Sequence, residues 1–411
     1  MTEVESKKDN TVTGTFEPSG ERGGGFIRLA KSNYRMLSTD PFVSEKMRTD
    51  LQLRGGETII GEAAMSKNNQ RPRQNKGRNQ RNGRNGRNQR GRDNNRNSQP
   101  TSKLQLQSVA TINGKELADY AGVEPFEDLT AINPQEQLKF STEGGPSSMR
   151  VVDLMAPIGL GQRGLIVAPP RTGKTVLLQQ MAHGIATNHP DIYMMVLLID
   201  ERPEEVTEMR RTVNGEVIAS SNDEDVANHI RLARLMTAKA KRHVEMGENV
   251  VILLDSLTRL GRAFNVGNRG RGRTMSGGLD ISALLEPKAI FGSARKVEDG
   301  GSLTIIASSL IETGSRMDDV IFNEFKGTGN MEIMLSRKMA DRRVWPAIDL
   351  VLSGTRREEL LLDEASLKAS VAIRRTLTER NPIEAMEKLT GALMKCSTND
   401  EFVKQVVGGR Y

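Results

Sequence analysis

The most informative segment of this chain is Gly164-Leu-Ile-Val-Ala-Pro-Pro-Arg-Thr-Gly-Lys-Thr175. It begins as an apolar strand, turns at prolines and a glycine, and opens an apolar-periodic helix that continues from Val176 to Met181. A phosphate-binding loop needs this context, because its backbone N–H groups and the helix N-terminus together surround phosphate oxygens. Ala168 replaces the first glycine of the usual pattern. The stretch predicts a nucleotide site in which Lys174 reaches the β- and γ-phosphates and the Thr175 hydroxyl ligates Mg²⁺.

Uninterrupted apolar runs alternate with helix-like segments from residue 151 onward. The runs are Gly164–Ala168, Met194–Ile199, Val217–Ala219, Val250–Leu254 and Leu303–Ala307. Runs of this length suit strands that are buried on both faces, as in a parallel sheet covered by helices. Between two of the runs, a cluster of acidic residues precedes a segment in which apolar residues recur at helical spacing. Acidic residues are favourable at the N-terminus of a helix. The pattern predicts an α/β fold over residues 151–411, closed by a few charged helices.

Two carboxylates follow these runs and extend the predicted phosphoryl-transfer site. Asp255 directly follows the run Val250–Leu254. Phosphoryl transfer requires a carboxylate on the metal side of the site, and Asp255 is the candidate. Glu201 follows the run Met194–Ile199, and a carboxylate at the carboxyl end of such a strand faces the ligand crevice. Glu201 is therefore the candidate base that polarises water, with a purely structural role as the alternative.

The basic character of the chain is confined to one segment. The whole chain has 411 residues, with 59 Lys and Arg against 52 Asp and Glu, a net charge of +7. Residues 66–100 hold eleven cations and one anion, a local charge of +10, so the remainder carries −3. The segment 66–101 has no Leu, Ile, Val or aromatic residue and cannot offset its chain entropy by burial. We expect it to be a disordered insert in a slightly acidic protein.

Short strands on both sides of this insert predict a small β-barrel. The expected strands are Thr11–Phe16, Phe26–Ala30, Phe42–Val43 and Thr58–Ile60, and alternation resumes at Leu104. The insert is then a long loop between two strands of one domain. We expect a disordered N-terminus over residues 1–10, the barrel with its insert over 11–115, a connector over 116–150, and the α/β domain over 151–411.

Several classes of protein are excluded by composition. One cysteine rules out a disulfide scaffold, and four scattered histidines argue against a histidine-built metal site. No apolar run approaches the ~18 residues that a membrane span needs. The first ten residues are polar and lack the apolar core of a signal peptide. We therefore expect a cytoplasmic protein without a membrane partner.

Five motifs, in order, resemble those of the bacterial transcription termination factor Rho family. They are Pro157–Thr175, Leu198–Met209, Ile252–Arg259, Glu324–Asn330 and Ser353–Arg356. The resemblance covers roughly residues 11–401, apart from the insert. It implies a RecA-like ATPase domain preceded by an OB-fold (cold-shock-like) barrel, in a homohexamer that binds nascent single-stranded RNA. It also implies ATP and Mg²⁺ as cofactors, 5′-to-3′ translocation as an RNA–DNA helicase, and release of transcripts from RNA polymerase.

The same resemblance assigns roles in the nucleotide site. Glu201 matches the catalytic glutamate, Asp255 matches the metal-side aspartate, and Arg356 matches an arginine finger inserted from the neighbouring subunit. Arg202 and Arg259 match further arginines around the γ-phosphate. The nucleotide-binding residues would be Pro169, Pro170, Arg171, Thr172, Gly173, Lys174, Thr175 and Val176, with Trp345 over the adenine. A core tryptophan beside Pro346 is the alternative for Trp345.

RNA binding divides between two regions in this family. In the barrel, Phe26, Arg28 and Phe42 match base-contacting positions, while Gly24 stands where a second stacking phenylalanine is usual. In the channel of the hexamer, the matching cations are Arg273, Arg316 and Lys326. The family often begins with a small helical domain, and we expect this chain to start almost directly in the barrel. The insert is interpreted as an RNA tether, with an inert linker as the alternative.

Two other classes of protein remain open. One is another RecA-like hexameric ATPase that is not coupled to RNA, such as a rotary ATP synthase catalytic subunit or a flagellar-type export ATPase. The other is a non-catalytic RNA-binding protein with a decayed nucleotide site. ATPase activity with and without RNA separates all three.

Overall fold

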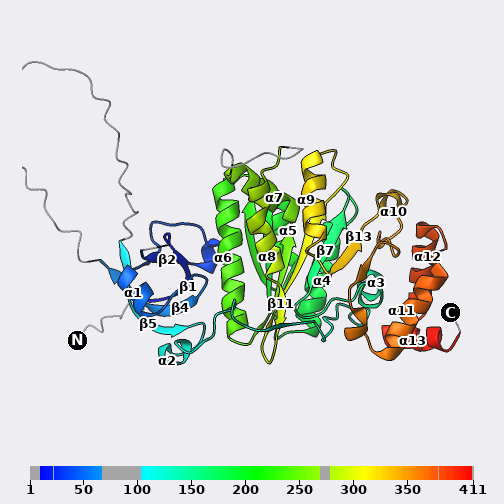
Figure 1. Cartoon of the computed structure of the whole chain (residues 1–411), viewed down its shortest axis with the longest axis horizontal. Coiled ribbons are helices and arrows are strands. Elements are labelled where there is room, and N and C mark those ends of the chain that lie inside the picture. The colour runs from blue at the N-terminus through cyan, green and yellow to red at the C-terminus, as the bar shows by residue number, and fades with distance from the viewer. Residues whose placement is uncertain (1–9, 22, 67–102, 269–277, 378, 410–411) are drawn as a thin grey trace, which may run out of the picture. The chain divides into compact units, whose positions relative to one another are not determined.

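The computed structural model describes residues 10–21, 23–66, 103–268, 278–377 and 379–409. The chain divides into two units, Met1–Gly122 and Val123–Tyr411 (Figure 1). The expected disordered N-terminus and almost all of the insert lie outside the described residues, apart from Asn10 and Ser66. The segment expected as a connector is shared, because residues 116–122 belong to the first unit and residues 123–150 to the second.

The described strands of the first unit close into a barrel, as the sequence predicts. They follow each other around it in the order β1 (Thr11–Pro18), β2 (Gly25–Arg28), β3 (Phe42–Val43), β5 (Leu104–Ile112) and β4 (Thr58–Met65). Phe16, Ile27 and Ile59 fill the interior and are fully buried. The unit also contains η1 (Ala30–Ser32), α1 (Glu45–Asp50) and α2 (Leu117–Tyr120).

The insert leaves from and returns to neighbouring strands of this barrel. β4 and β5 pair antiparallel, and their register runs out to Met65 opposite Leu104. One step further, the backbone N–H of Ser66 donates to the carbonyl of Lys103 at 2.9 Å. The two ends of the segment 67–102 therefore lie on neighbouring strands of one barrel.

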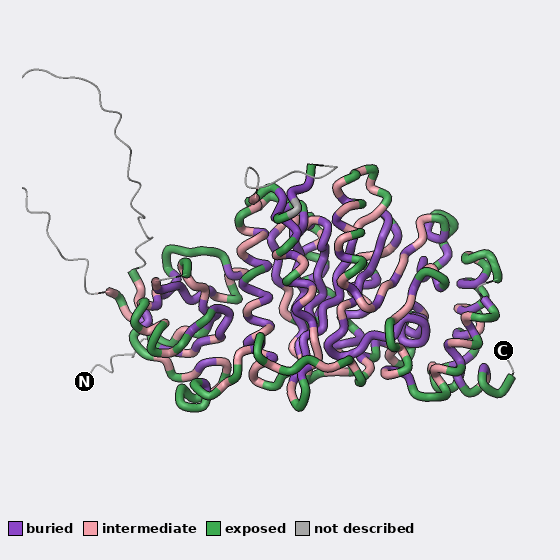
Figure 2. Tube along the Cα trace, viewed as in Figure 1, coloured by how far each residue is buried: buried purple, intermediate pink, exposed green. Residues whose placement is uncertain are grey.

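A mostly parallel sheet forms the centre of the second unit. Among the described residues its order is β14-β13-β7-β12-β10-β8-β9, with β11 paired to β12 and β6 paired to β11. The strands are β6 (Ala131–Ile132), β7 (Arg163–Ala168), β8 (Tyr193–Glu201), β9 (Glu216–Ser221), β10 (Asn249–Asp255), β11 (Arg295–Val297), β12 (Ser302–Leu310), β13 (Met331–Met334) and β14 (Gly354–Thr355). Each predicted apolar run of this unit lies within one of the parallel strands, and Figure 2 shows the sheet as a buried block.

Helices cover the sheet and extend beyond it. They are α3 (Ser147–Met155), α4 (Lys174–Asn188), α5 (Pro203–Thr212), α6 (Val226–Glu245), α7 (Leu257–Gly267), η3 (Ile281–Leu284), α8 (Leu285–Gly292), α9 (Arg316–Lys326), α10 (Arg337–Asp341), η4 (Glu358–Leu360), α11 (Glu364–Leu377), α12 (Pro382–Leu393) and α13 (Asn399–Val407). α6 begins after the predicted acids, where the Asp225 side chain accepts from the Asn228 N–H at 2.7 Å. Among the described residues, no helix is long and apolar enough to cross a membrane.

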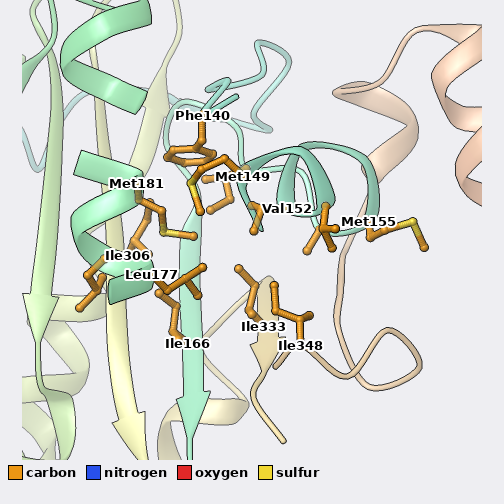
Figure 3. Close-up of a cluster of buried hydrophobic side chains, with 14 of the residues drawn as sticks. Phe140, Met149, Val152, Met155, Ile166, Leu177, Met181, Ile306, Ile333 and Ile348 are labelled. Atoms are coloured by element: carbon orange, nitrogen blue, oxygen red, sulfur yellow. The ribbon is translucent and has the colours of Figure 1, made fainter. Parts of the chain in front are cut away.

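A buried cluster fixes the helix that follows the phosphate loop. Leu177 and Met181 of α4 pack with Ile166 of β7 and with Met149 and other apolar residues of α3 (Figure 3). Each of these side chains is 4% exposed or less. Burying an apolar side chain of this size stabilises a fold by ~1.5–3 kcal/mol. The start of α4, where the phosphates are expected, is therefore anchored from behind by the core.

Candidate nucleotide-hydrolysis site

The phosphate loop joins the end of β7 to the start of α4. Thr172 is buried, and its hydroxyl donates to the carbonyl of Pro169 at 2.7 Å, which closes the turn. Gly173 has a φ of 84° and precedes the first helical residue, Lys174. A side chain on Gly173 would place its Cβ 2.9 Å from the Trp345 ring. Glycine is therefore required here by both the backbone conformation and the contact.

The replacement of the first motif glycine has a structural explanation. Ala168 is the last residue of β7 and pairs with Leu310 of β12, so its backbone is extended. The turn begins only after it, and a methyl group fits because the position needs no left-handed conformation. The departure from the strict motif therefore leaves the loop intact.

Lys174 meets two carboxylates at the ends of neighbouring strands. Its ammonium forms a short ion pair with Asp255 at the end of β10 and lies 3.4 Å from Glu201 Oε1 at the end of β8. The Ser308 hydroxyl, from β12, donates to Asp255 Oδ1 at 2.7 Å. The parallel strands thus bring together the three groups that the sequence predicted, because their carboxyl ends share one edge of the sheet.

The environment of Glu201 raises its pKa to about 7, chiefly because the side chain is buried. The negative charge of Asp255 raises the pKa further, and the cations Lys174 and Arg259 oppose that rise. Burial lowers the pKa of Lys174, but the two carboxylates outweigh it and raise the pKa above its ordinary value. A carboxylate with a pKa near neutrality suits proton transfer at physiological pH.

A bulge in β8 aims Glu201 into the site. The register with β9 shifts between Ile199 and Glu201, and Asp200 between them adopts a φ of 57°. Arg259, in the first turn of α7, donates to the carbonyl of Asp200 and lies 3.2 Å from Glu201 Oε1. Bulges commonly redirect side chains next to active sites. Asp200 therefore forms the bulge that orients Glu201. The sequence did not predict this role, because its only signal was the position of Asp200 at the end of a strand.

An apolar pocket of about 360 Å³ lies beside the phosphate loop. Its lining includes Gly173, Val176, Leu177, Trp345 and Ile348. Trp345 is 45% exposed and presents its ring to the loop instead of filling the core. A half-exposed indole over an apolar pocket is suited to a planar heterocycle.

Three predicted arginines form no ion pair with the carboxylates of this cluster among the described contacts. Arg171 and Arg202 are exposed, the first in the loop and the second before α5. Arg356 follows β14, and its N–H donates to the carbonyl of Asn330 at 2.9 Å. β14 reaches β7, through β13, near Gly164. That end of β7 is roughly 16 Å along the strand from the phosphate loop, at ~3.3 Å per residue.

The predicted RNA contacts of the barrel are partly buried. The rings of Phe26 and Phe42 pack edge to face with centroids 5.4 Å apart. Arg28 is 6% exposed and forms ion pairs with Glu17 and, at 2.6 Å, with Asp40. A side chain on Gly24 would meet the Val43 carbonyl at 2.1 Å and the Phe42 ring at 2.7 Å. Phe42 therefore occupies the space beside Gly24, and Arg28 is held within the barrel.

Two of the three predicted channel cations belong to α9. Arg316 and Lys326 are the first and last residues of α9, and both are exposed. Arg273 lies outside the described residues.

A mostly parallel sheet with a phosphate loop after β7 and carboxylates at the same edge, at the ends of β10 and β8, defines a P-loop ATPase of the RecA type. Residues 148–355 match the ATP synthase alpha/beta family, nucleotide-binding domain. The chain is 46% identical over 383 residues to transcription termination factor Rho of Cereibacter sphaeroides. The aligned region covers 92% of this chain and 83% of the relative. The chain belongs to the transcription termination factor Rho family.

Other relatives agree with this family assignment, and a solved structure agrees with the fold. Rho of Karelsulcia muelleri is 44% identical over 382 residues, 93% of each chain. Rho of Streptosporangium roseum is 54% identical over 302 residues, 74% of this chain and 78% of that one. A solved ATPase of a bacterial type III secretion system shares the fold, with a TM-score of 0.59 and 20% identity over 75% of this chain and 95% of that one. The chain is thus a nucleotide-binding, ATP-hydrolysing enzyme.

Proposed function

We propose that this chain ends transcription by binding nascent single-stranded RNA, hydrolysing ATP and moving 5′ to 3′ along the RNA as a cytoplasmic homohexamer. This movement would separate RNA from DNA and release the transcript from RNA polymerase. The observation that carries the proposal is the intact Lys174–Glu201–Asp255 cluster behind the phosphate loop in a member of this family. Because the cluster is complete, it argues against a decayed nucleotide site.

The donor set of the site fits magnesium with ATP. Mg²⁺ prefers hard oxygen ligands and keeps several waters, so one carboxylate, one hydroxyl and phosphate oxygens suffice. Asp255 supplies the carboxylate and Thr175, in the first turn of α4, the hydroxyl. The bound ion would neutralise charge on the phosphates. Lys174 would bind the β- and γ-phosphates, and the pocket beneath Trp345 would hold the adenine.

Glu201 would orient the attacking water and accept its proton. Its carboxylate is 3% exposed, and Arg259 and Lys174 hold it from two sides. Arg202, exposed before α5, would approach the γ-phosphate. This assignment follows the position of Glu201 and its near-neutral pKa, which let it act as a base at physiological pH.

Arg356 would act on the nucleotide of a neighbouring subunit. Within its own chain it lies near the start of β7, away from the phosphate loop that follows the end of this strand. It lines a surface pocket with Asn330 and Glu332, and the residue is exposed. An arginine delivered from a neighbour stabilises charge in the transition state.

Arg356→Ala is expected to lower ATP turnover by about 10³-fold while ATP binding is largely retained, because the finger acts on the transition state. Mixed hexamers of Arg356→Ala and Lys174→Ala subunits test the assignment in trans. A Lys174→Ala subunit keeps Arg356, and an Arg356→Ala subunit keeps Lys174. Where the first lies beside the second, one complete site forms, so mixing should restore some activity. Mixtures as inactive as either variant alone would contradict a finger in trans.

RNA binding would use both regions that the family motifs mark. In the barrel, the half-buried Phe42, which packs against the buried Phe26, would offer aromatic surface for base stacking. In the ATPase unit, the exposed cations Arg316 and Lys326, together with Arg273, would contact phosphates in the channel. The insert would add sequence-independent phosphate contacts.

ATPase turnover with and without poly(C) RNA tests the proposal. Strong stimulation by RNA is expected, and Arg316→Ala should reduce it without changing turnover in the absence of RNA. Equal turnover with and without RNA would favour the alternative of an ATPase that is not coupled to RNA. No turnover at all would favour a binding protein.

A further inference from the structure

A buried cluster of polar side chains lies at the end of β9, next to the strand that carries Glu201. Ser220 is fully buried and His229 is 4% exposed. The Ser220 Oγ and His229 Nδ1 atoms are 2.7 Å apart. The same Oγ accepts from Asn228 Nδ2 at 2.9 Å and lies 3.0 Å from Glu224 Oε2. None of these residues takes part in the hydrolysis described above.

The Ser220 hydroxyl has one proton and two acceptors within reach, Glu224 Oε2 and an unprotonated His229 Nδ1. When Ser220 donates to Glu224, which is charged and the stronger acceptor, a protonated His229 Nδ1 donates to Ser220. Asn228 donates to both Ser220 and Glu224, so the cluster is satisfied in either arrangement. Burial lowers the pKa of His229, which keeps the ring neutral and leaves one N–H to assign. A nucleophilic role for Ser220 is excluded, because a fully buried hydroxyl reaches no substrate.

This cluster borders the bulge that aims Glu201. Ser220 pairs with Ile199 and Ser221 pairs with Glu201, so the register shift falls between them. The next residue, Asn222, donates its backbone N–H to the carbonyl of Glu201 at 3.0 Å. The end of β9 therefore sets where the backbone of Glu201 lies.

The bulge is held from a second direction by Arg259, which binds the carbonyl of Asp200. Asp200 has a φ of 57°, which a non-glycine residue adopts only when its surroundings impose it. α7 supplies one restraint through Arg259, and β9 supplies the other through Ser221 and Asn222. The β9 restraint depends on α6, because His229 and Asn228 belong to its first turn.

We propose that Ser220 and His229 are positioning residues for ATP hydrolysis, which hold the end of β9 so that Glu201 reaches the attacking water. The proposal rests on the assignment of Glu201 as the catalytic base. Removing either partner leaves a buried polar group without its hydrogen bond and loosens the segment that borders the bulge. A displacement of the base by about 1 Å can cost about 100-fold in rate.

Steady-state ATPase kinetics at saturating RNA, with His229→Leu and Ser220→Ala, test this role. Both variants are expected to lower kcat by about 10- to 100-fold while the KM for ATP changes by less than about 2-fold, since the nucleotide contacts are elsewhere. His229→Asn returns an N–H donor near the position of Nδ1 and should recover most of the lost kcat. His243→Ala is the control at the far end of α6, where the ring stacks on Tyr193 and contacts Glu248, and it should behave as wild type.

Three results would overturn the proposal. They are a folded His229→Leu variant with normal kcat, a His229→Asn variant as slow as His229→Leu, or a loss of kcat that simply follows the melting temperature across all variants, His243→Ala included. Glu201→Gln separates this proposal from the function on which it rests. If that variant hydrolyses ATP normally, the base assignment fails. If it is inactive while His229→Leu is normal, only the positioning role fails.

Discussion

Glu201→Gln is expected to lower ATP turnover by about 10²- to 10⁴-fold, the range that removal of a general base produces. Glutamine keeps the size of the side chain, but it loses the charge that pairs with Arg259 and cannot accept a proton. ATP binding should persist, because Lys174 and the phosphate loop are unchanged. The measurement is single-turnover hydrolysis together with equilibrium binding of a fluorescent ATP analogue.

The matched control for this change is Glu204→Gln. Glu204 is exposed in the first turn of α5, three residues from Glu201, and the structure places it outside the cluster. Its replacement should leave turnover near the wild-type value. Turnover by Glu201→Gln that equals the control would remove Glu201 from the chemistry and assign its buried position to stability alone.

Lys174→Ala is expected to abolish hydrolysis and to prevent tight ATP binding, since the only ammonium in the cluster would be lost. It should also reduce the stability of the free protein. Asp255 and Glu201 are 2% and 3% exposed, and both lose their contact with Lys174. Removing one partner from such a buried arrangement costs ~3 kcal/mol or more in the free energy of unfolding.

Urea denaturation and nucleotide binding measure the two effects separately. Lys288→Ala is the control, because its 2.7 Å ion pair with Glu324 lies at the surface. An exposed pair of that kind contributes ~0–1 kcal/mol. If Lys174→Ala binds ATP as wild type does, the phosphate-loop assignment is wrong.

The strands and the phosphate loop could be predicted from the sequence because their signals are local. Each buried run in the α/β region became a parallel strand, and Gly173 and Lys174 stand where the loop motif requires. Asp255 and Glu201 could be placed at the carboxyl ends of strands for a similar reason, since Asp255 directly follows an apolar run and Glu201 follows one after Asp200. The rule that parallel strands end at one edge then brought them together.

The remainder of the site depends on contacts between distant residues. Nothing local marks the bulge at Asp200, which arises from pairing with β9 and from Arg259 on α7. The link between Ser220 and His229 likewise joins a strand to the following helix. In the barrel, the ion pairs that hold Arg28 inside come from Glu17 and Asp40, and the motif around Phe26 does not show them.

Release of RNA from a stalled elongation complex shows whether the protein couples ATP hydrolysis to transcript release. Transcription complexes immobilised through their DNA would be incubated with the hexamer and ATP, and radiolabelled RNA would be measured in the supernatant. We expect the wild-type protein to release the transcript only when ATP is present, and Glu201→Gln to release none. RNA that stays bound to the complex while the wild-type protein hydrolyses ATP would contradict the account.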